Sequence, residues 1–483
     1  MKRELGLVKV LKTFVVIGAA AAISSCSSPI PNGPPIIPNF ADLGSYMAAL
    51  NASKDPQAVA IRQEIADGPS DLAHEKADCL AHGIPIAFPV NTVPSDQDAR
   101  PLYLHWDALR RKQKAEFPPY ANPLAPHFAY TPEQLDRIQK IIDSHPAVFA
   151  LLHNAAKKPY LTNPPLNYSV FSKCREGARE ILTESFLLAH RGDYSDAIAI
   201  QTLGFALARQ FSRQPNLMNY LVGSAVQGIA ITGLQDTLSM AGPNRRVDEQ
   251  VASTLKANQI QFSLKDALAG ETPTQLYVIS IAKASSTKDP EGAFAYLAGK
   301  LGSARKSSVP ATPEEVKFIG NTSDAATARY LRQQIVVVRA AGQTPSARDA
   351  AFKRIDAENA QSSNVDSAKI DPISAWCIPL DSYVSFGQNN RRMLARVQII
   401  LAASAVLSKR AQSGHYPAKL PGTFLDPYNG NQLTYRHTGD KSFIIYSVGP
   451  DGSYKGEEPA KGGATRFHYP PLPPVPIPAD MLR

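Results

Sequence analysis

The sequence lacks the motifs of several common catalytic chemistries. It contains no G-x-G-x-x-G and no G-x-S-x-G, and Lys306-Ser307 lacks the preceding glycine of a phosphate-binding loop. These absences argue against a dinucleotide-binding fold, a serine-hydrolase elbow and a P-loop nucleotide site. The ten histidines follow no pattern, and no run of five like charges occurs. With a net charge of +9 spread along the chain, we expect no nucleic-acid partner.

What the chain does contain indicates a globular protein. Of its 483 residues, 44% are hydrophobic and 19% are charged, a balance that excludes wholesale disorder. The 40 prolines exclude a chain made only of regular helix. This length predicts two or three domains.

The N-terminus has the order of an export signal. A basic start precedes an apolar run from Phe14 to Ile23, which is too short to span a bilayer, and small residues follow. Ile23-Ser24-Ser25-Cys26 resembles the lipobox of bacterial lipoproteins. The resemblance implies a signal peptide at 1–25 and acylation of Cys26, which would anchor the chain to a membrane of the cell envelope. An ordinary secretory signal and an uncleaved anchor helix remain alternatives.

The residues after Cys26 refine this expectation. Lipoproteins that are retained at the inner membrane often carry Asp directly after the lipidated cysteine. This chain has Ser27 there, which favours a location at the periplasmic face of the outer membrane. Residues 26–40 are rich in proline and predict an extended tether. Besides Cys26 the chain has Cys79, Cys174 and Cys377, which predict either three buried thiols or one disulfide and one free thiol.

Residues 41–388 read as a mostly α-helical domain. Helical periodicity is present over 41–80, with expected breaks at Pro56 and Pro69, and residues 84–126 predict an irregular segment with one helix near 105–116. Thr131-Pro132-Glu133-Gln134 predicts a capped helix start. Further predicted helices are 169–190, 194–211, 216–240, 314–319, 326–341 and 346–361, with a break at 299–313.

Two details of this domain predict its packing. Gly192-Asp193 predicts a turn between antiparallel helices, in which Asp193 caps the second one. Residues 214–235 carry no formal charge, and we expect a buried helix there, with a membrane span as the alternative.

The pattern changes over 389–456. A long helix over 391–412 ends at Gly414 and is followed by strands at 433–436 and 443–448, which together predict a small module of a helix and a β-hairpin. The fold class is therefore mainly α, with antiparallel helix pairs and a small α+β module at the C-terminus. The proline-rich residues 457–483 predict an extended tail, with a segment that binds a polyproline-reading groove as the alternative.

The module resembles the globular head of the major pseudopilins of type II secretion systems. The motifs that carry the resemblance are Gly414-His415-Tyr416-Pro417, Asp426-Pro427-Tyr428 and residues 446–452, YSVGPDG. The rest of the chain resembles uncharacterised bacterial envelope proteins. Pseudopilin heads bind calcium after this last motif, so the resemblance implies a calcium site at Asp451, to which Glu457 and Glu458 could add ligands. A solvated turn without calcium is the alternative.

One stretch comes close to a zinc motif. His74-Glu75-Lys76-Ala77-Asp78 resembles H-E-x-x-H with Asp78 in place of the second histidine, and Cys79 and His82 follow. We expect a solvated helix end rather than a metal site, because no third ligand has a recognisable spacing.

These patterns predict a non-enzymatic, lipid-anchored envelope protein with a scaffold or protein-interaction role. One alternative is a hydrolase-like envelope enzyme whose site combines distant residues, such as His74 and the 84–126 segment. Another is an accessory component of a secretion or pilus-like system. No catalytic residue and no cofactor other than calcium is predicted.

Overall fold

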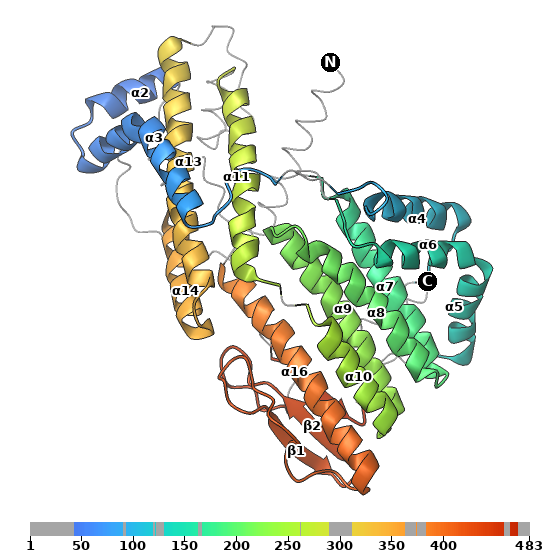
Figure 1. Ribbon diagram of the computed structural model, residues 1–483. Helices are drawn as coiled ribbons and strands as arrows, with labels where there is room; N and C mark the ends of the chain where they lie inside the picture. The colour runs from blue at the N-terminus through green and yellow to red at the C-terminus, as the bar shows by residue number, and fades with distance from the viewer. Residues whose placement is uncertain are drawn as a thin grey trace. The chain divides into compact units, whose positions relative to one another are not determined.

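The computed structural model describes residues 43–89, 93–118, 121, 130–162, 167–260, 262–288, 312–362, 373, 383–457 and 464–471. Most of these residues are helical, and a small three-stranded antiparallel sheet lies near the C-terminus, so the predicted fold class is confirmed (Figure 1). The helices are α2 Leu43–Ala52, α3 Pro56–Ala81, α4 Arg100–Gln113, α5 Pro132–Ser144, α6 Pro146–Lys157, α7 Ser169–His190, α8 Tyr194–Ser212, α9 Leu217–Ala241, α10 Arg245–Asn258, α11 Leu264–Ser286, α13 Pro313–Ala341, α14 Pro345–Ser362 and α16 Tyr383–Ser413. The strands are β1 Thr434–Gly439, β2 Ser442–Tyr446 and β3 Arg466–Tyr469.

The chain divides into two compact units. The first combines Met1–Ala77, Val278–Arg332 and Phe352–Ser385, and the second holds the remaining segments. Each unit is thus built from segments that are far apart in the sequence, which no local pattern along the chain indicates.

The first unit has its core where α2, α3 and α13 meet. Buried side chains such as Leu50, Ile61 and Ile319 fill it. Across its edge Arg329 donates two hydrogen bonds to Glu64, of 2.9 Å from Nε and 2.6 Å from Nη2. This bidentate ion pair ties α3 to α13.

Helix α3 corrects the predicted break at Pro69, because it runs through this proline. Packing explains the difference. A Cβ on the neighbouring Gly68 would lie 2.7 Å from the carbonyl oxygen of Asn321, so the backbones of α3 and α13 approach closely here. We attribute the continuity of the helix to this contact, which offsets the backbone hydrogen bond that proline cannot make.

The second unit is centred on α7, α8 and α9, which lie side by side (Figure 1). On one side, α4 and α6 complete a core that contains Trp106, Leu152 and Phe211. On the other side, α10, α16 and the sheet complete a second core that contains Leu234, Ile400 and Phe443. The sheet and α16 therefore share their core with the helical bundle.

Several predicted boundaries are confirmed in this unit. Thr131 and Gln134 form the expected capping box at the start of α5. Helices α7 and α8 join at a turn in which Gly192 has a φ of +83°. The predicted role of Asp193 is wrong, because its side chain makes no capping hydrogen bond.

Helix α9 is long and apolar enough to cross a membrane, but 72% of its most apolar stretch is buried in the protein, as expected of a central helix.

Other boundaries differ from the prediction. Helix α4 begins at Arg100, because Pro101 occupies its first turn, where proline needs no hydrogen-bond partner. The two helices expected at 314–319 and 326–341 are one helix, α13. Of the predicted break at 299–313, residues 299–311 lie outside the described part of the chain.

The C-terminal sheet has the order β1-β2-β3 with antiparallel pairs throughout. The hairpin of β1 and β2 was expected, whereas β3 was not. It lies within 457–483, where the sequence predicted only an extended tail. Phe443 pairs with Tyr469 and Ile445 with Phe467, so β3 adds aromatic side chains to the shared core.

Two of the three pseudopilin-like motifs, at 426–428 and at 446–452, are held together by one carboxylate. Asp426 is buried, and its Oδ1 accepts hydrogen bonds of 3.0 Å from Ser447 Oγ and from the Tyr428 backbone N–H. Its Oδ2 accepts one of 2.8 Å from the Val448 N–H. In this chain, therefore, these residues connect the loop before the hairpin to the end of β2.

Candidate functional site

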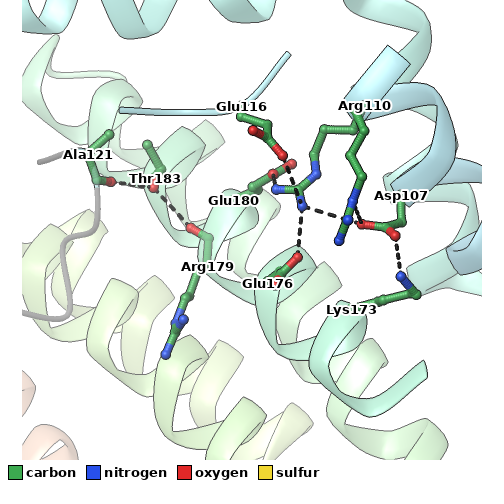
Figure 2. A network of polar contacts seen from close by, with 10 residues as sticks. Asp107, Arg110, Glu116, Ala121, Lys173, Glu176, Arg179, Glu180 and Thr183 are labelled. Carbon is green, nitrogen blue, oxygen red and sulfur yellow. Dashed lines mark hydrogen bonds and ion pairs between the residues drawn. The ribbon is translucent and has the colours of Figure 1, made fainter. Parts of the chain in front are cut away.

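A dense group of charged side chains lies between α4 and α7. On α4, Asp107 and Arg110 are one helical turn apart, and on α7, Lys173, Glu176 and Glu180 recur at spacings of three and four. Residues at these spacings share one face of a helix. The two faces meet, and Figure 2 shows the resulting network, to which Glu116 adds a further carboxylate.

Arg110 is the centre of this network. Its Nη1 donates a 2.8 Å hydrogen bond to Glu180 Oε1, and its Nη2 donates one of 2.8 Å to Glu176 Oε2 (Figure 2). Nη2 also lies 3.4 Å from Asp107 Oδ1 and 3.7 Å from Glu116 Oε1. One guanidinium thus interacts with four carboxylates from three segments of the chain.

Asp107 has two further partners. Its Oδ2 accepts a hydrogen bond from Lys173 Nζ, and its Oδ1 accepts one of 3.2 Å from Arg111 Nε. Burial acts to raise the pKa of Asp107, but the hydrogen bonds and charges of Lys173 and Arg111 outweigh it and lower this pKa from its ordinary value. Asp107 is therefore ionised at neutral pH.

Glu180 has the opposite environment. Burial raises its pKa to about 8, and the charges of Glu176 and Glu116 act in the same direction, although Arg110 opposes them. Burial acts to lower the pKa of Arg110, but its carboxylate neighbours outweigh it and raise this pKa. Around neutral pH the network therefore keeps the charge on Arg110 and favours a proton on Glu180.

Close packing of α4, α6 and α7 holds the Arg110 network in place. Trp106 is fully buried, and the Arg110 guanidinium lies 5.0 Å from its ring centre. A Cβ on Gly177 would lie 2.7 Å from Leu152 Cδ1 and 3.7 Å from the Trp106 ring, so this glycine lets α7 approach its neighbours. The position therefore needs a residue without a side chain.

The geometry suits an electrostatic clamp between helices. Glu180 is buried, and its Oε2 has no hydrogen-bond partner among the described residues. The Arg110 Nε is equally enclosed. Because these atoms face protein rather than an open cleft, the arrangement stabilises the contact of α4 with α7 and gives a substrate no direct approach to Glu180.

A small pocket elsewhere in the second unit has a volume of about 130 Å³. Phe211, Tyr220 and Phe262 give it an apolar lining, and Asp266 is the carboxylate on its wall. None of the described lining residues is a histidine, so the pocket does not supply the histidine–carboxylate pair that the alternative enzyme hypothesis requires.

Two side chains of the zinc-like motif at 74–82 contact other groups of the protein. Glu75 accepts a 2.8 Å hydrogen bond from Arg332 Nε. The His82 Nδ1 lies 2.8 Å from the Asp78 carbonyl oxygen, and its Nε2 contacts the Arg339 guanidinium. Among the residues that the structure describes, no group of three histidine, cysteine or acidic side chains, those at His74 and Cys79 included, is arranged to hold a metal ion.

The residues of the implied calcium site also have other partners. Asp451 accepts a 3.1 Å hydrogen bond from the Ser453 backbone N–H, and Arg436 lies 3.3 Å from Glu457. Glu458 lies outside the described residues, as do the lipidation residue Cys26 and Cys377. Of the remaining cysteines, Cys79 and Cys174 are buried, and burial raises the pKa of Cys174 well above its ordinary value.

The network around Arg110 was missed in the sequence. The spacing of Asp107 and Arg110 on one side and of Lys173, Glu176 and Glu180 on the other could have indicated two charged helix faces. Nothing local, however, showed that the two faces meet, because their interacting residues are 66 to 70 positions apart in the chain. Comparison of the chain with models of known families, with curated proteins and with solved structures gave no match.

Proposed function

We propose that this protein is a lipid-anchored component of the bacterial cell envelope whose helical body acts as a binding scaffold rather than as an enzyme. The observation that carries the proposal is the tetrapeptide Ile23-Ser24-Ser25-Cys26 after a basic and then apolar start. A tether over 26–40 would place the folded units away from the lipid surface.

The charged network supports the scaffold part of the proposal. A catalytic acid or base must reach a substrate, whereas Arg110 and the buried Glu180 bind each other inside a helix contact. The shared core of α16, the sheet and α8 to α10 supports it as well, because it joins the C-terminal sheet to the helical bundle.

The anchor is tested by Cys26→Ser in the full-length chain. We expect the wild-type protein to fractionate with membranes and to yield a mature N-terminal peptide that starts at a diacylated Cys26. The variant should lose the lipid and appear in the soluble fraction. Ser28→Ala, which lies outside the tetrapeptide, serves as the matched control. An unmodified or uncleaved Cys26 in the wild type would contradict the proposal.

The scaffold role is tested by crosslinking in intact cells. We expect the anchored protein to form the same crosslinks to other envelope proteins in repeated experiments, and Cys26→Ser to reduce them, since lipid anchoring concentrates the chain at the membrane. If secretion components are among the partners, the role as an accessory of that machinery gains support. A protein without reproducible crosslinks would not be a scaffold.

A further inference from the structure

A second arginine cluster in the same unit differs from the network around Arg110. Arg348 and Asp349 are the fourth and fifth residues of α14, and Arg391 lies on α16. Both arginines are buried, each with 7% of its surface exposed. Two cations that are far apart in the sequence are thus enclosed together.

These two arginines have few partners. The Arg391 Nη2 lies 3.0 Å from Asp349 Oδ2, and the Arg348 Nε lies 3.6 Å from Asp349 Oδ1. The second distance is too long for a hydrogen bond. The Nε atoms of both arginines and the Arg348 Nη2 make no hydrogen bond with any described residue, and the Arg391 Nη2 has its ion pair with Asp349. One carboxylate is therefore shared between two guanidinium groups.

The surroundings do not supply the missing negative charge. The Tyr428 ring centre lies 5.8 Å from the Arg391 guanidinium, and the buried Tyr220 hydroxyl lies near Arg348 and Asn390. These neighbours are neutral. Burial acts to lower the pKa of Arg348, and the positive charge of Arg391 adds to this effect, while Asp349 opposes it. Within the described chain, the cluster keeps an excess of positive charge.

Burying a guanidinium without hydrogen bonds costs free energy, and such sites are favourable when an anion completes them. The three nitrogen atoms without a partner suit a tetrahedral oxyanion, which accepts hydrogen bonds on several oxygens at once. Asp349, whose side chain is 21% exposed, is the member of the cluster nearest to solvent.

We propose that Arg348 and Arg391 form a binding site for a phosphate-type oxyanion, with Asp349 as the internal carboxylate that competes with it. The phosphate belongs either to free inorganic phosphate or to the headgroup of an anionic lipid. Both sources present the same oxygens to the two arginines. The site is independent of the lipid anchor and of the scaffold role.

The experiment measures the unfolding temperature of the purified full-length protein in increasing sodium phosphate, compared with sodium chloride of equal ionic strength. We expect phosphate to raise this temperature in a saturable way, because it binds the folded state. Arg348→Gln should weaken the apparent affinity by about tenfold or more, as the loss of a charge-assisted contact does. Arg245→Gln, on an exposed ion pair of α10, is the matched control and should leave the affinity unchanged.

Asp349→Asn provides a second test, which does not depend on whether Arg348→Gln folds. Removal of the competing carboxylate should tighten phosphate binding several-fold. In a second arm, vesicles of phosphatidylcholine with phosphatidylglycerol replace free phosphate. Binding to these vesicles but not to phosphatidylcholine alone, lost in Arg348→Gln, identifies a lipid headgroup as the source. If phosphate and chloride act alike and the anionic vesicles do not bind, the proposal is wrong.

Discussion

Arg110 and Arg348 are two buried guanidinium groups with opposite electrostatic surroundings. Arg110 interacts with four carboxylates, whereas Arg348 shares a single carboxylate with Arg391. The first group is saturated with negative charge and even favours a proton on Glu180. The second has only one carboxylate among the described residues for two guanidinium groups. The contrast teaches that burial of an arginine does not by itself indicate its role, since the balance of charge around it separates a structural clamp from a candidate binding site.

The largest expected effect comes from the saturated network. Arg110→Met leaves its carboxylates facing one another without their central cation, and removal of one member of a buried ion pair typically costs about 3–5 kcal/mol. Urea unfolding at neutral pH, followed by circular dichroism, measures the loss. Arg245→Gln on the surface of α10 should change the free energy of unfolding by about 0.5 kcal/mol or less. A loss that small for Arg110→Met would mean that the clamp does not stabilise the fold.

Removal of one carboxylate from each cluster compares how strongly the two sets of arginines depend on a single negative partner. Asp349→Asn should cost about 1–3 kcal/mol, because two buried arginines lose their shared partner. Glu176→Gln should cost less than about 1 kcal/mol, because Arg110 keeps three other carboxylates and Glu176 is more than one third exposed. The same urea titration compares the two variants. Equal losses would show that the two clusters do not differ in charge balance.

The smallest expected effect concerns Glu180 and the pH dependence of the free energy of unfolding. The folded chain keeps a proton on Glu180 up to about pH 8, whereas the unfolded chain releases it near the ordinary value of 4.5. The folded state therefore binds more protons in this window. The contribution of this proton to the free energy of unfolding is fully present below the unfolded-state pKa of 4.5. It is lost as the pH rises through the folded-state pKa of about 8.

Glu180→Gln cannot titrate, so its stability should fall less between about pH 5 and about pH 9 than that of the wild type. Urea midpoints across this range measure the difference. Glu249→Gln, an exposed glutamate of the Arg245 ion pair, should keep the wild-type slope. A wild-type slope that Glu180→Gln leaves intact would place the titrating group elsewhere.

Local sequence signals predicted much of the fold. The capping box at Thr131, the turn at Gly192 and the end of α16 before Gly414 are decided by a few neighbouring residues, and each is found in the structure. The predictions failed where distant segments decide the outcome. Helix α3 runs through Pro69 because of α13, and β3 exists because residues 466–469 pair with β2.

The candidate sites were harder to predict. Single side chains with recognisable motifs, such as Cys26 and Asp451, could be named from the sequence. The network around Arg110 and the cluster of Arg348 with Arg391 could not, because their members lie on separate helices and carry no motif.

The sequence by itself determined the helical class and the bounds of several helices, among them α7, α8, α9 and α14, because periodicity, capping and short motifs act over a few residues. The lipid anchor stays a prediction from a short motif. Tertiary structure alone decided which charged helix faces meet, how many carboxylates surround each buried arginine, and that β3 completes the sheet. Burial and charge balance depend on residues brought together from across the chain, and no stretch of sequence contains them.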